Sequence, residues 1–562
     1  TAGELDELWR KRIKNDWLSL KLAEREVDDI RETLDKRYSR IDKRVSEFNA
    51  QDIYQFFMNS FARSIEPHSS YMSPRLADNF EISMKLSLDG IGALLGTDDE
   101  YVEVQEVIAG GPADLDGRLK AGDRIISVAP DSEEVIDVVG WRLDDVVDLI
   151  RGERETPVQL EVLPAESGIK GPPVLIELVR NEVKLEEQAA KSSIQEIEVD
   201  GELRRIGIID VPVFYVDFRG RARNEPDYRS STRDVRRLIH ELEADGIEGL
   251  VIDLRGNGGG ALVEATTMTG LFIDEGPVVQ VRDAGGRVTI EADREPGMSW
   301  DGPLAVLVDR SSASASEIFA AALQDYGRGI VIGEATFGKG TVQNLFNLDN
   351  YANDDKRLGQ VKLTMAKFFR IDGGSTQSRG VVPDIELPTF TDPTEYGESA
   401  LDYALEWSQI EQTDYQPLAN LAPLTQAARK LHLARRESDE ELQELIKDYG
   451  RYAALRERTS ISLLESERLK EHEESEDRRR ARFGHDDADI EGAEDGVEVD
   501  GGTDDADSEQ TDDGDRQGDD EQTPPDILLK ESARILVDLI ELDRDQHRLV
   551  QVAEPPTPGS LD

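Results

Sequence analysis

The stretch from residue 304 to residue 343 constrains the fold most, because it combines two apolar runs with a helix between them. Leu304–Val308 predicts a buried strand, and Glu317–Asp325 has the composition of a helix that ends at Gly327. A second apolar run, Gly329–Gly333, follows. The turn between the first strand and the helix is therefore held by rigid elements, close to the positive end of the helix.

This turn is rich in serine, and a lysine follows the second apolar run. The serines are Ser311, Ser312, Ser314 and Ser316, and Lys339 lies between two glycines. A serine hydroxyl becomes a good nucleophile when a base takes its proton, and a desolvated lysine can lose its charge near neutral pH and act as that base. The residues indicate a Ser–Lys hydrolase, but composition does not say which serine attacks. Alternatively, Lys339 is an ordinary surface lysine in a glycine turn and has no catalytic role.

The chain is strongly acidic, with 119 Asp and Glu against 66 Lys and Arg and a net charge of -53. This balance argues against nucleic-acid binding, which needs basic surface. Residues 485–522 carry 18 of the acidic residues, and the remaining excess is spread over the rest of the chain. Adaptation to high salt is one hypothesis for this excess, and a generally acidic proteome is the other.

Several chemistries are excluded or disfavoured by residue type. The chain has no cysteine, so cysteine nucleophiles, thiolate metal sites and disulfides are absent. None of the six histidines lies in an HExxH pattern and no complete EF-hand spacing occurs, so we expect no metal and no other cofactor. His68, between two prolines, is expected to be a hydrogen-bonded structural histidine, with a functional role as the alternative.

The ends of the chain read as helical. Residues 1–64 place apolar side chains at helical spacings, and residues 394–482 are again helical and highly charged. Residues 486–520 are rich in Asp and Gly and are expected to be disordered. An amphipathic helix at 527–540 is expected to dock back on the helical region. No apolar run is long enough to span a bilayer, and we expect the chain to be a fragment without its signal peptide.

Residues 84–182 resemble a PDZ domain. The resemblance is carried by "GGPAD" at 110–114 followed by "LKAGDRII" at 119–126, with strands on either side and a helix near 141–151. It implies that the domain binds extended C-terminal peptides, whose carboxylate is held by backbone N–H groups of a glycine loop. The residues assigned to this site are Gly90, Ile91, Gly92, Ala93, Val146 and Ile150, although each apolar one could instead belong to the core.

Between 183 and 390 the chain predicts a mixed α/β core. Strands are expected at 206–214, 249–254 and 361–371, a helix at 232–245 and a hairpin at 279–300. The strand at 249–254 is followed by Arg255–Gly260, which contains three successive glycines. Such a loop at a helix start can expose N–H groups to an oxyanion or a phosphate, but it lacks the P-loop pattern.

The order of these motifs resembles the tail-specific proteases, or C-terminal processing peptidases. The PDZ-like module is followed by "DLRGNGGGAL", "SASASEIFAAALQDYGR", "GEATFGKGTVQ" and "RGVVPDI", and the N-terminal helices carry "WRKRIKND" and "EPHSSYMSP". The resemblance implies a multidomain α+β fold, in which a ClpP/crotonase-like serine protease core contains an inserted PDZ domain and is flanked by α-helical domains.

We divide the chain into six parts on this basis. They are an N-terminal helical domain (1–80), the PDZ domain (84–182), the protease core (183–390), a C-terminal helical domain (391–484), an acidic disordered insertion (485–524) and a C-terminal helix and tail (525–562). The insertion is unusual for the family, and Glu66 stands where the family commonly has aspartate.

The resemblance also assigns roles, residue by residue. It makes Ser314 the nucleophile, Lys339 the general base and Gln343 the residue that orients the lysine. The oxyanion hole is formed by the N–H groups of Gly260 and Ala315, with Gly259 as the alternate. Supporting roles fall to Glu317, Asp325 and Thr336.

The implied function is ATP-independent endopeptidase activity through an acyl-enzyme. Substrates are expected to be periplasmic proteins with unstructured, apolar C-terminal tails, recognised by the PDZ domain, which also acts as a gate. A lipoprotein adaptor is a candidate partner, and any membrane association is expected to be peripheral. Two other functions are the alternatives. A non-catalytic peptide-binding scaffold is one, and a crotonase-like acyl-CoA enzyme, which would explain the glycine loop but neither the PDZ module nor the Ser–Lys pair, is the other.

Overall fold

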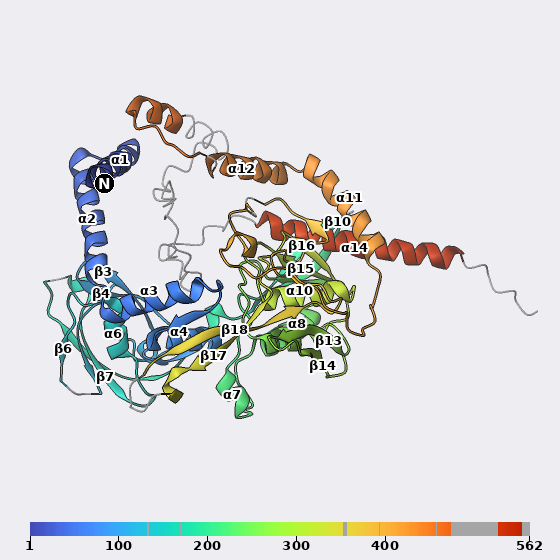
Figure 1. Ribbon diagram of the computed structural model, residues 1–562, viewed down its shortest axis with the longest axis horizontal. Helices are drawn as coiled ribbons and strands as arrows, with labels where there is room; N and C mark the ends of the chain where they lie inside the picture. Colours follow the sequence, from blue (N-terminus) through green and yellow to red (C-terminus); the bar gives the residue numbers. More distant parts are fainter. Residues whose placement is uncertain are drawn as a thin grey trace, which may run out of the picture. The chain divides into compact units, whose positions relative to one another are not determined.

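The structure is a computed structural model (Figure 1). It describes residues 1–131, 134–168, 170–199, 201–351, 357–389, 391–392, 394–456, 458–473 and 526–553. The predicted acidic disordered insertion lies outside these residues. The chain forms two compact units, one made of Thr1–Ile53 with Arg451–Asp519 and the other of Tyr54–Gly450 with Asp520–Asp562. Among the described residues no helix is long and apolar enough to cross a membrane.

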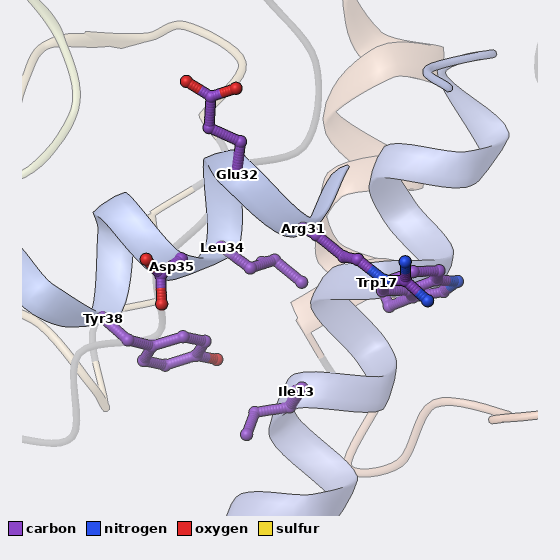
Figure 2. A pocket seen from close by; sticks show the side chains of 7 residues that line it. All are labelled: Ile13, Trp17, Arg31, Glu32, Leu34, Asp35 and Tyr38. Atoms are coloured by element: carbon purple, nitrogen blue, oxygen red, sulfur yellow. The ribbon is translucent and has the colours of Figure 1, made fainter. Parts of the chain in front are cut away.

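The first unit is built on two amphipathic helices, α1 (Ala2–Leu22) and α2 (Val27–Ser46), as the helical spacing predicted. Leu18 of α1 and Ile30 and Leu34 of α2 are buried between them. A pocket lies between the two helices, and Figure 2 shows the side chains around it. They are Ile13, Trp17, Arg31, Glu32, Leu34, Asp35 and Tyr38.

The PDZ domain in the second unit is an antiparallel sheet covered by two helices. The strands, in spatial order, are β3 (Ala93–Asp98), β4 (Tyr101–Val107), β5 (Arg124–Pro130), β7 (Pro157–Leu163) and β8 (Val174–Val179), with β6 (Ile136–Asp137) beside β5. The helices are α5 (Pro112–Asp116) and α6 (Leu143–Ile150). Alternate strand residues are buried against α6, which is the pattern of a sheet with one covered face. The predicted strands and helix of this domain are confirmed.

The two ends of the PDZ domain leave it side by side. β2 (Ser87–Gly90) precedes the domain and pairs antiparallel with β9 (Asn181–Lys184), which follows it. β2 is preceded by α4 (Pro74–Lys85), and α3 (Ala50–Arg63) lies before that. The PDZ domain is therefore an insertion whose entry and exit form one short ribbon.

Residues 183–390 contain a mainly parallel sheet. Its order is β10 (Lys191–Val199), β11 (Glu202–Asp210), β12 (Gly249–Asp253), β15 (Leu304–Val308), β16 (Ile330–Gly333) and β19 (Ile385–Glu386), and only the β10–β11 pair is antiparallel. The central strands β12, β15 and β16 are buried on both faces, which explains why they are continuous apolar runs. In β15, Leu304, Val306 and Val308 face one core cluster, and Ala305 and Leu307 face the other.

Different helices cover the two faces. On one face lie α8 (Ser231–Ala244), α9 (Leu262–Thr269) and α10 (Ala315–Asp325). Phe319 of α10 belongs to the same core cluster as Ile252 of β12 and Val306 of β15. On the other face lie α14 (Ile527–Ala553) and α11 (Ala422–Ser438). Figure 1 shows α14 in red beside β15 and β16.

The amphipathic helix predicted at 527–540 docks on the C-terminal helical region, as expected, and on the sheet as well. Ile535, Leu536 and Ile540 belong to the core cluster beneath the sheet. The helix also contacts α11, where His432 Nδ1 lies 2.8 Å from Glu531 Oε1. Amphipathicity gave the apolar face correctly, but it did not say which surface that face covers.

A second, antiparallel sheet joins the N-terminal segment to the core. β18 (Gln360–Phe369) pairs with β13 (Gly276–Asp283), with β17 (Thr341–Asn347) and with β1 (Ser70–Met72), and β14 (Val288–Asp293) completes the predicted hairpin with β13. The "EPHSSYMSP" segment therefore belongs to the same sheet as residues 276–369, because β1 aligns Ser70 with Lys362.

Two predicted elements are shorter than expected. The strand predicted at 206–214 ends at Asp210, and Phe214 instead forms a bridge with Gly260. Residues 402–421 are not helical. They cross the core in extended form, with the N–H of Ile410 donating to Gly373 O and the N–H of Leu418 donating to Tyr326 O. α11 and α12 (Glu440–Arg456) begin after this crossing.

The contact between α14 and the sheet predicts a large stability effect. Leu536 is 1% exposed, so Leu536→Ala removes buried methyl groups and leaves a cavity, and we expect it to lower the free energy of unfolding by about 2–5 kcal/mol. Leu433→Ala on α11 is the matched control, because Leu433 is 47% exposed, and we expect a change within about 0.5 kcal/mol. Denaturant unfolding of both variants checks this; equal effects would contradict the placement of α14.

Candidate active site

Three turns meet at the carboxyl edge of the parallel sheet. The glycine loop follows β12, the serine turn follows β15 and the lysine turn follows β16, and these three strands are neighbours in the order β12, β15, β16. The carboxyl ends of adjacent parallel strands lie at one edge, where open α/β sheets commonly bind ligands. Sheet topology therefore brings together the three motifs that the sequence places up to 80 residues apart.

Ser314 occupies a strained position at the start of α10. It is the N-cap residue, with φ 56° and ψ -108°. A positive φ is unfavourable for a residue with a Cβ atom, and such strain is frequent where a nucleophile sits on a sharp strand-to-helix turn. The preceding turn is held by Asp309, whose carboxylate accepts hydrogen bonds from the N–H groups of Ser311, Ser312 and Gly256.

The neighbouring serines have structural partners. Ser312 and Ser316 are fully buried, and their hydroxyls donate to the backbone carbonyls of Leu254 and Asn257. The hydroxyl of Ser311 lies 3.4 Å from that of Tyr396. Ser314 is partly exposed, so burial separates it from Ser312 and Ser316, which composition could not do.

The glycine loop packs directly on the serine turn. Gly259 has φ 112°, and a Cβ there would lie 2.9 Å from Ser314 Cβ and from the carbonyl of Ala313. Gly260 has φ 138°, and a Cβ there would lie 2.4 Å from the carbonyl of Phe214. Both positions need glycine for conformation and for space. The N–H of Gly259 donates to Asn257 Oδ1 at 2.9 Å, so it is already engaged.

Asn257 is a residue of this site that the sequence did not single out. It is fully buried, and its side-chain nitrogen donates to Val211 O at 2.7 Å. Its backbone carbonyl accepts the N–H of Ala313 and the hydroxyl of Ser316. Asn257 thus connects the glycine loop to the serine turn. The only signal in the sequence was a lone amide residue among glycines.

Glycines also shape the lysine turn. Gly338 has φ 98°, and a Cβ on Gly340 would lie 2.9 Å from the backbone nitrogen of Gln377. The two glycines that flank Lys339 therefore allow residues 377–379 to pack against the turn. The Lys339 side chain is partly exposed.

Glu317 links the serine and lysine turns. Its Oε2 accepts the N–H of Ser314 at 2.8 Å and the N–H of Lys339 at 2.9 Å, and its Oε1 accepts the N–H of Gly338 and the hydroxyl of Thr336. One carboxylate oxygen thus holds the backbones of the predicted nucleophile and the predicted base. Glu317 is fully buried, and burial raises its pKa to about 7 although its four hydrogen bonds act in the opposite direction.

Gln343 lies on β17 at a bulge between Val342 and Gln343. A bulge changes the direction of a side chain relative to the regular strand. The amide nitrogen of Gln343 donates to the hydroxyls of Thr341 and Thr364, at 2.8 and 3.1 Å. This arrangement fixes the orientation of the amide at the end of the lysine turn.

The other two predicted supports have packing roles. Thr336 is buried, and its hydroxyl donates to Glu317. The same hydroxyl accepts the N–H of Val381 at 2.7 Å, and this bond connects the lysine turn to the "RGVVPDI" segment. Asp325 ends α10 and forms a buried ion pair with Arg370. Burial is the largest influence on the Asp325 carboxyl and raises its pKa, although the pair with Arg370 lowers it.

The residues predicted to form the peptide site of the PDZ domain lie in two settings. Ile91, Val146 and Ile150 are at most 3% exposed and pack in the domain core, which is the alternative that the sequence left open. The loop that holds Gly90, Gly92 and Ala93 packs on the "GGPAD" segment. The N–H of Ile108 donates to Gly92 O, and the N–H of Ala113 donates to Ile91 O.

In the described part of the chain, no group of three or more His, Asp or Glu side chains could hold a metal ion. The side chains gathered at the sheet edge are instead a serine, a lysine and a glutamine, with backbone N–H groups of a glycine loop beside them. These groups can carry out acyl transfer.

Four stretches of the chain match known protein families. Residues 1–75 match the tail specific protease N-terminal domain, 80–163 the PDZ domain, 205–387 peptidase family S41, and 391–541 the C-terminal domain of tail specific protease. Together the four matches cover most of the chain, in the order that the motifs indicated.

Individual relatives agree with these families. The chain is 39% identical over 550 residues to the tail-specific protease of Haemophilus influenzae, which covers 97% of this chain and 74% of the relative. It is 33% identical over 334 residues to the carboxy-terminal processing protease CtpA of Bacillus subtilis, covering 58% of this chain and 62% of the relative. A solved PDZ domain of a carboxy-terminal protease from Vibrio cholerae, in complex with a peptide, is 48% identical and covers 18% of this chain and all of that one, with a TM-score of 0.17.

These matches, with the fold, define a serine-type peptidase that carries a PDZ domain between flanking helical regions. The chain belongs to peptidase family S41, among the tail-specific or C-terminal processing proteases. The family and the multidomain α+β fold class predicted from the motifs are confirmed.

The raised pKa of Glu317 predicts a specific pH dependence. Between about pH 4.5 and pH 7 the folded protein keeps a proton on Glu317 that the unfolded chain has released. The contribution of Glu317 to the free energy of unfolding therefore falls as pH rises through this window, by up to about 1.4 kcal/mol per pH unit. We expect Glu317→Gln to lack this slope. Denaturant unfolding of both proteins at several pH values measures it, and parallel curves would contradict the assignment.

Proposed function

We propose that this protein is an ATP-independent serine endopeptidase that cleaves proteins with unstructured, apolar C-terminal tails. Ser314 is the nucleophile and Lys339 the general base. The observation that carries this proposal is the Glu317 carboxylate, which accepts hydrogen bonds from the backbone N–H groups of both residues. It supports their action as a pair, since it holds the serine and lysine turns against each other.

The reaction proceeds in two steps. Lys339, in its neutral form, takes the proton of the Ser314 hydroxyl while Oγ attacks the peptide carbonyl, and the proton then passes to the leaving amine as the C–N bond breaks. Water hydrolyses the resulting ester and restores the serine. The amide of Gln343 orients the lysine, in the place that a carboxylate takes in a Ser-His-Asp triad.

The oxyanion of the tetrahedral intermediate is bound by the N–H groups of Gly260 and Ala315. Ala315 is the first residue of α10, so its N–H also lies at the positive end of a helix. Between the two candidate glycines, the geometry favours Gly260, because the N–H of Gly259 donates to Asn257.

The PDZ domain selects the substrate. An extended tail adds to the edge of β3, and its carboxylate is held by the backbone of the loop from Gly90 to Ala93. Tail binding acts as a gate only if it stabilises the cleavage-competent arrangement in preference to other arrangements. We place this activity in the periplasm, with envelope proteins as substrates and a lipoprotein adaptor as a further partner.

The nucleophile is tested with a matched pair of serine variants. Ser314→Ala removes the attacking oxygen, and we expect cleavage of an unfolded protein with an apolar C-terminal tail to fall by at least about 1,000-fold. Ser311→Ala, three residues upstream, changes the same atoms in the same turn, and we expect it to keep most of the activity. Cleavage is followed by gel electrophoresis and mass spectrometry; substantial cleavage by Ser314→Ala would defeat the assignment.

The tail-binding loop is tested with two glycine variants. A Cβ on Gly92 would lie 3.0 Å from Gly111 Cα, so Gly92→Ala displaces the loop, and we expect tail-peptide Kd and the KM for tailed proteins to rise about tenfold or more. Gly110→Ala is the control, since Gly110 has a similar φ of 75° but no heavy atom within 4 Å of a Cβ. Peptide binding measured by fluorescence anisotropy separates the two; unchanged Kd in Gly92→Ala would exclude this loop.

A further inference from the structure

A line of hydrogen bonds runs from the segment before the PDZ domain to the lysine turn. His68 Nε2 lies 2.7 Å from Glu398 Oε2, and Glu398 Oε1 accepts the side-chain nitrogen of Gln377 at 2.6 Å. Gln377 Oε1 in turn accepts the N–H of Gly340 at 2.8 Å. Gly340 immediately follows Lys339, so this line ends beside the proposed base.

The Gly340–Gln377 and Gln377–Glu398 bonds have a fixed direction, and the direction of the His68–Glu398 bond follows from an ionised Glu398. A backbone N–H can only donate, so the amide oxygen of Gln377 faces Gly340 and its nitrogen faces Glu398. The Glu398 carboxylate therefore accepts at both ends, and His68 must present an N–H at Nε2. Glu398 and Gln377 are fully buried, and the His68 side chain is 12% exposed. A buried acceptor that loses its donor is costly, so the line acts as a unit.

A second line reaches the other end of the same turn. Glu66 Oε2 accepts the hydroxyl hydrogen of Thr364 at 3.0 Å, so the Thr364 oxygen is oriented to accept the amide nitrogen of Gln343 at 3.1 Å. This leaves Oε1 as the Gln343 atom that can accept from a lysine amine. The segment itself is fixed, because the Thr364 N–H donates to Ser69 Oγ and β1 pairs with β18.

We propose that the segment Glu66–Ser69 is part of the active site, with Glu66 and His68 as positioning residues for Lys339 and Gln343. This inference rests on the proposed function, since it concerns the geometry of the proposed base. The two lines hold Gly340 and Gln343 from a segment that lies almost 300 residues earlier in the chain. Small displacements of catalytic groups reduce the rate strongly, so loss of either line lowers kcat.

The first line is tested by two variants of His68. His68→Ala removes the donor to Glu398, and we expect kcat on a tailed protein to fall about 10- to 100-fold. KM and the Kd for a tail peptide stay unchanged, because the PDZ groove is not altered. His68→Gln, whose amide N–H can donate to Glu398, recovers most of kcat. His240→Ala is the control, since His240 lies 3.2 Å from Glu243 on the exposed face of α8, and we expect wild-type kinetics.

The second line is tested by Thr364→Val, which keeps the shape of the side chain but removes the hydroxyl that orients Gln343. We expect kcat to fall while the unfolding transition stays near that of the wild type, and we expect Thr364→Ser to restore kcat. This pair keeps the inference testable even if His68→Ala does not fold.

Defined outcomes would overturn the inference. Wild-type kcat in both His68→Ala and Thr364→Val would do so. The inference would also be overturned if His68→Ala and His68→Gln lost kcat equally and lost unfolding stability equally. In that case His68 would be a packing residue only. Cleavage by Ser314→Ala would instead defeat the proposed function itself, so the two failures are distinguishable.

Discussion

The hydrogen bonds to the Glu317 carboxylate are the interaction on which the rest of the site depends. A carboxylate with no N–H or O–H partner could not be buried at this depth, and two turns without a common acceptor would not be held at this spacing. Four donors from two turns meet on this one side chain. Burial of the negative charge on Glu317 is unfavourable, and the raised pKa of Glu317 reflects this cost. The same hydrogen bonds fix the serine and lysine turns relative to each other.

Much of the architecture could be predicted from sequence, for identifiable physical reasons. Both faces of the parallel sheet are covered, so β12, β15 and β16 are short apolar runs that a pattern of residues reveals. The glycines at 259, 260 and 338 stand where positive φ and close contacts exclude other residues, so they also stood out as a motif. Their roles at the site remain predictions.

The features that sequence could not supply depend on contacts between distant segments. The apolar face of α14 was readable, but the strands that it covers lie far upstream in the sequence. For Val146 and Ile150 the sequence left open a peptide site or the core, because an apolar residue on a helix can face either, and both pack in the core of the domain. Asn257 bonds to a backbone carbonyl, and His68 bonds to a buried carboxylate. Neither partner can be read from the spacing of residues in the sequence.

The placement of β1 and α14 has a consequence for the order in which the protein is made. β1 is synthesised early, but its partner β18 emerges about 290 residues later, and α14 covers the sheet only after residue 540 is complete. The closure of such long loops is slow and costs chain entropy. A nascent chain therefore contains Ser314 and Lys339 well before it contains a complete core. Because α14 supplies part of the core beneath the sheet that leads to both residues, one face of that sheet stays uncovered until α14 has been made.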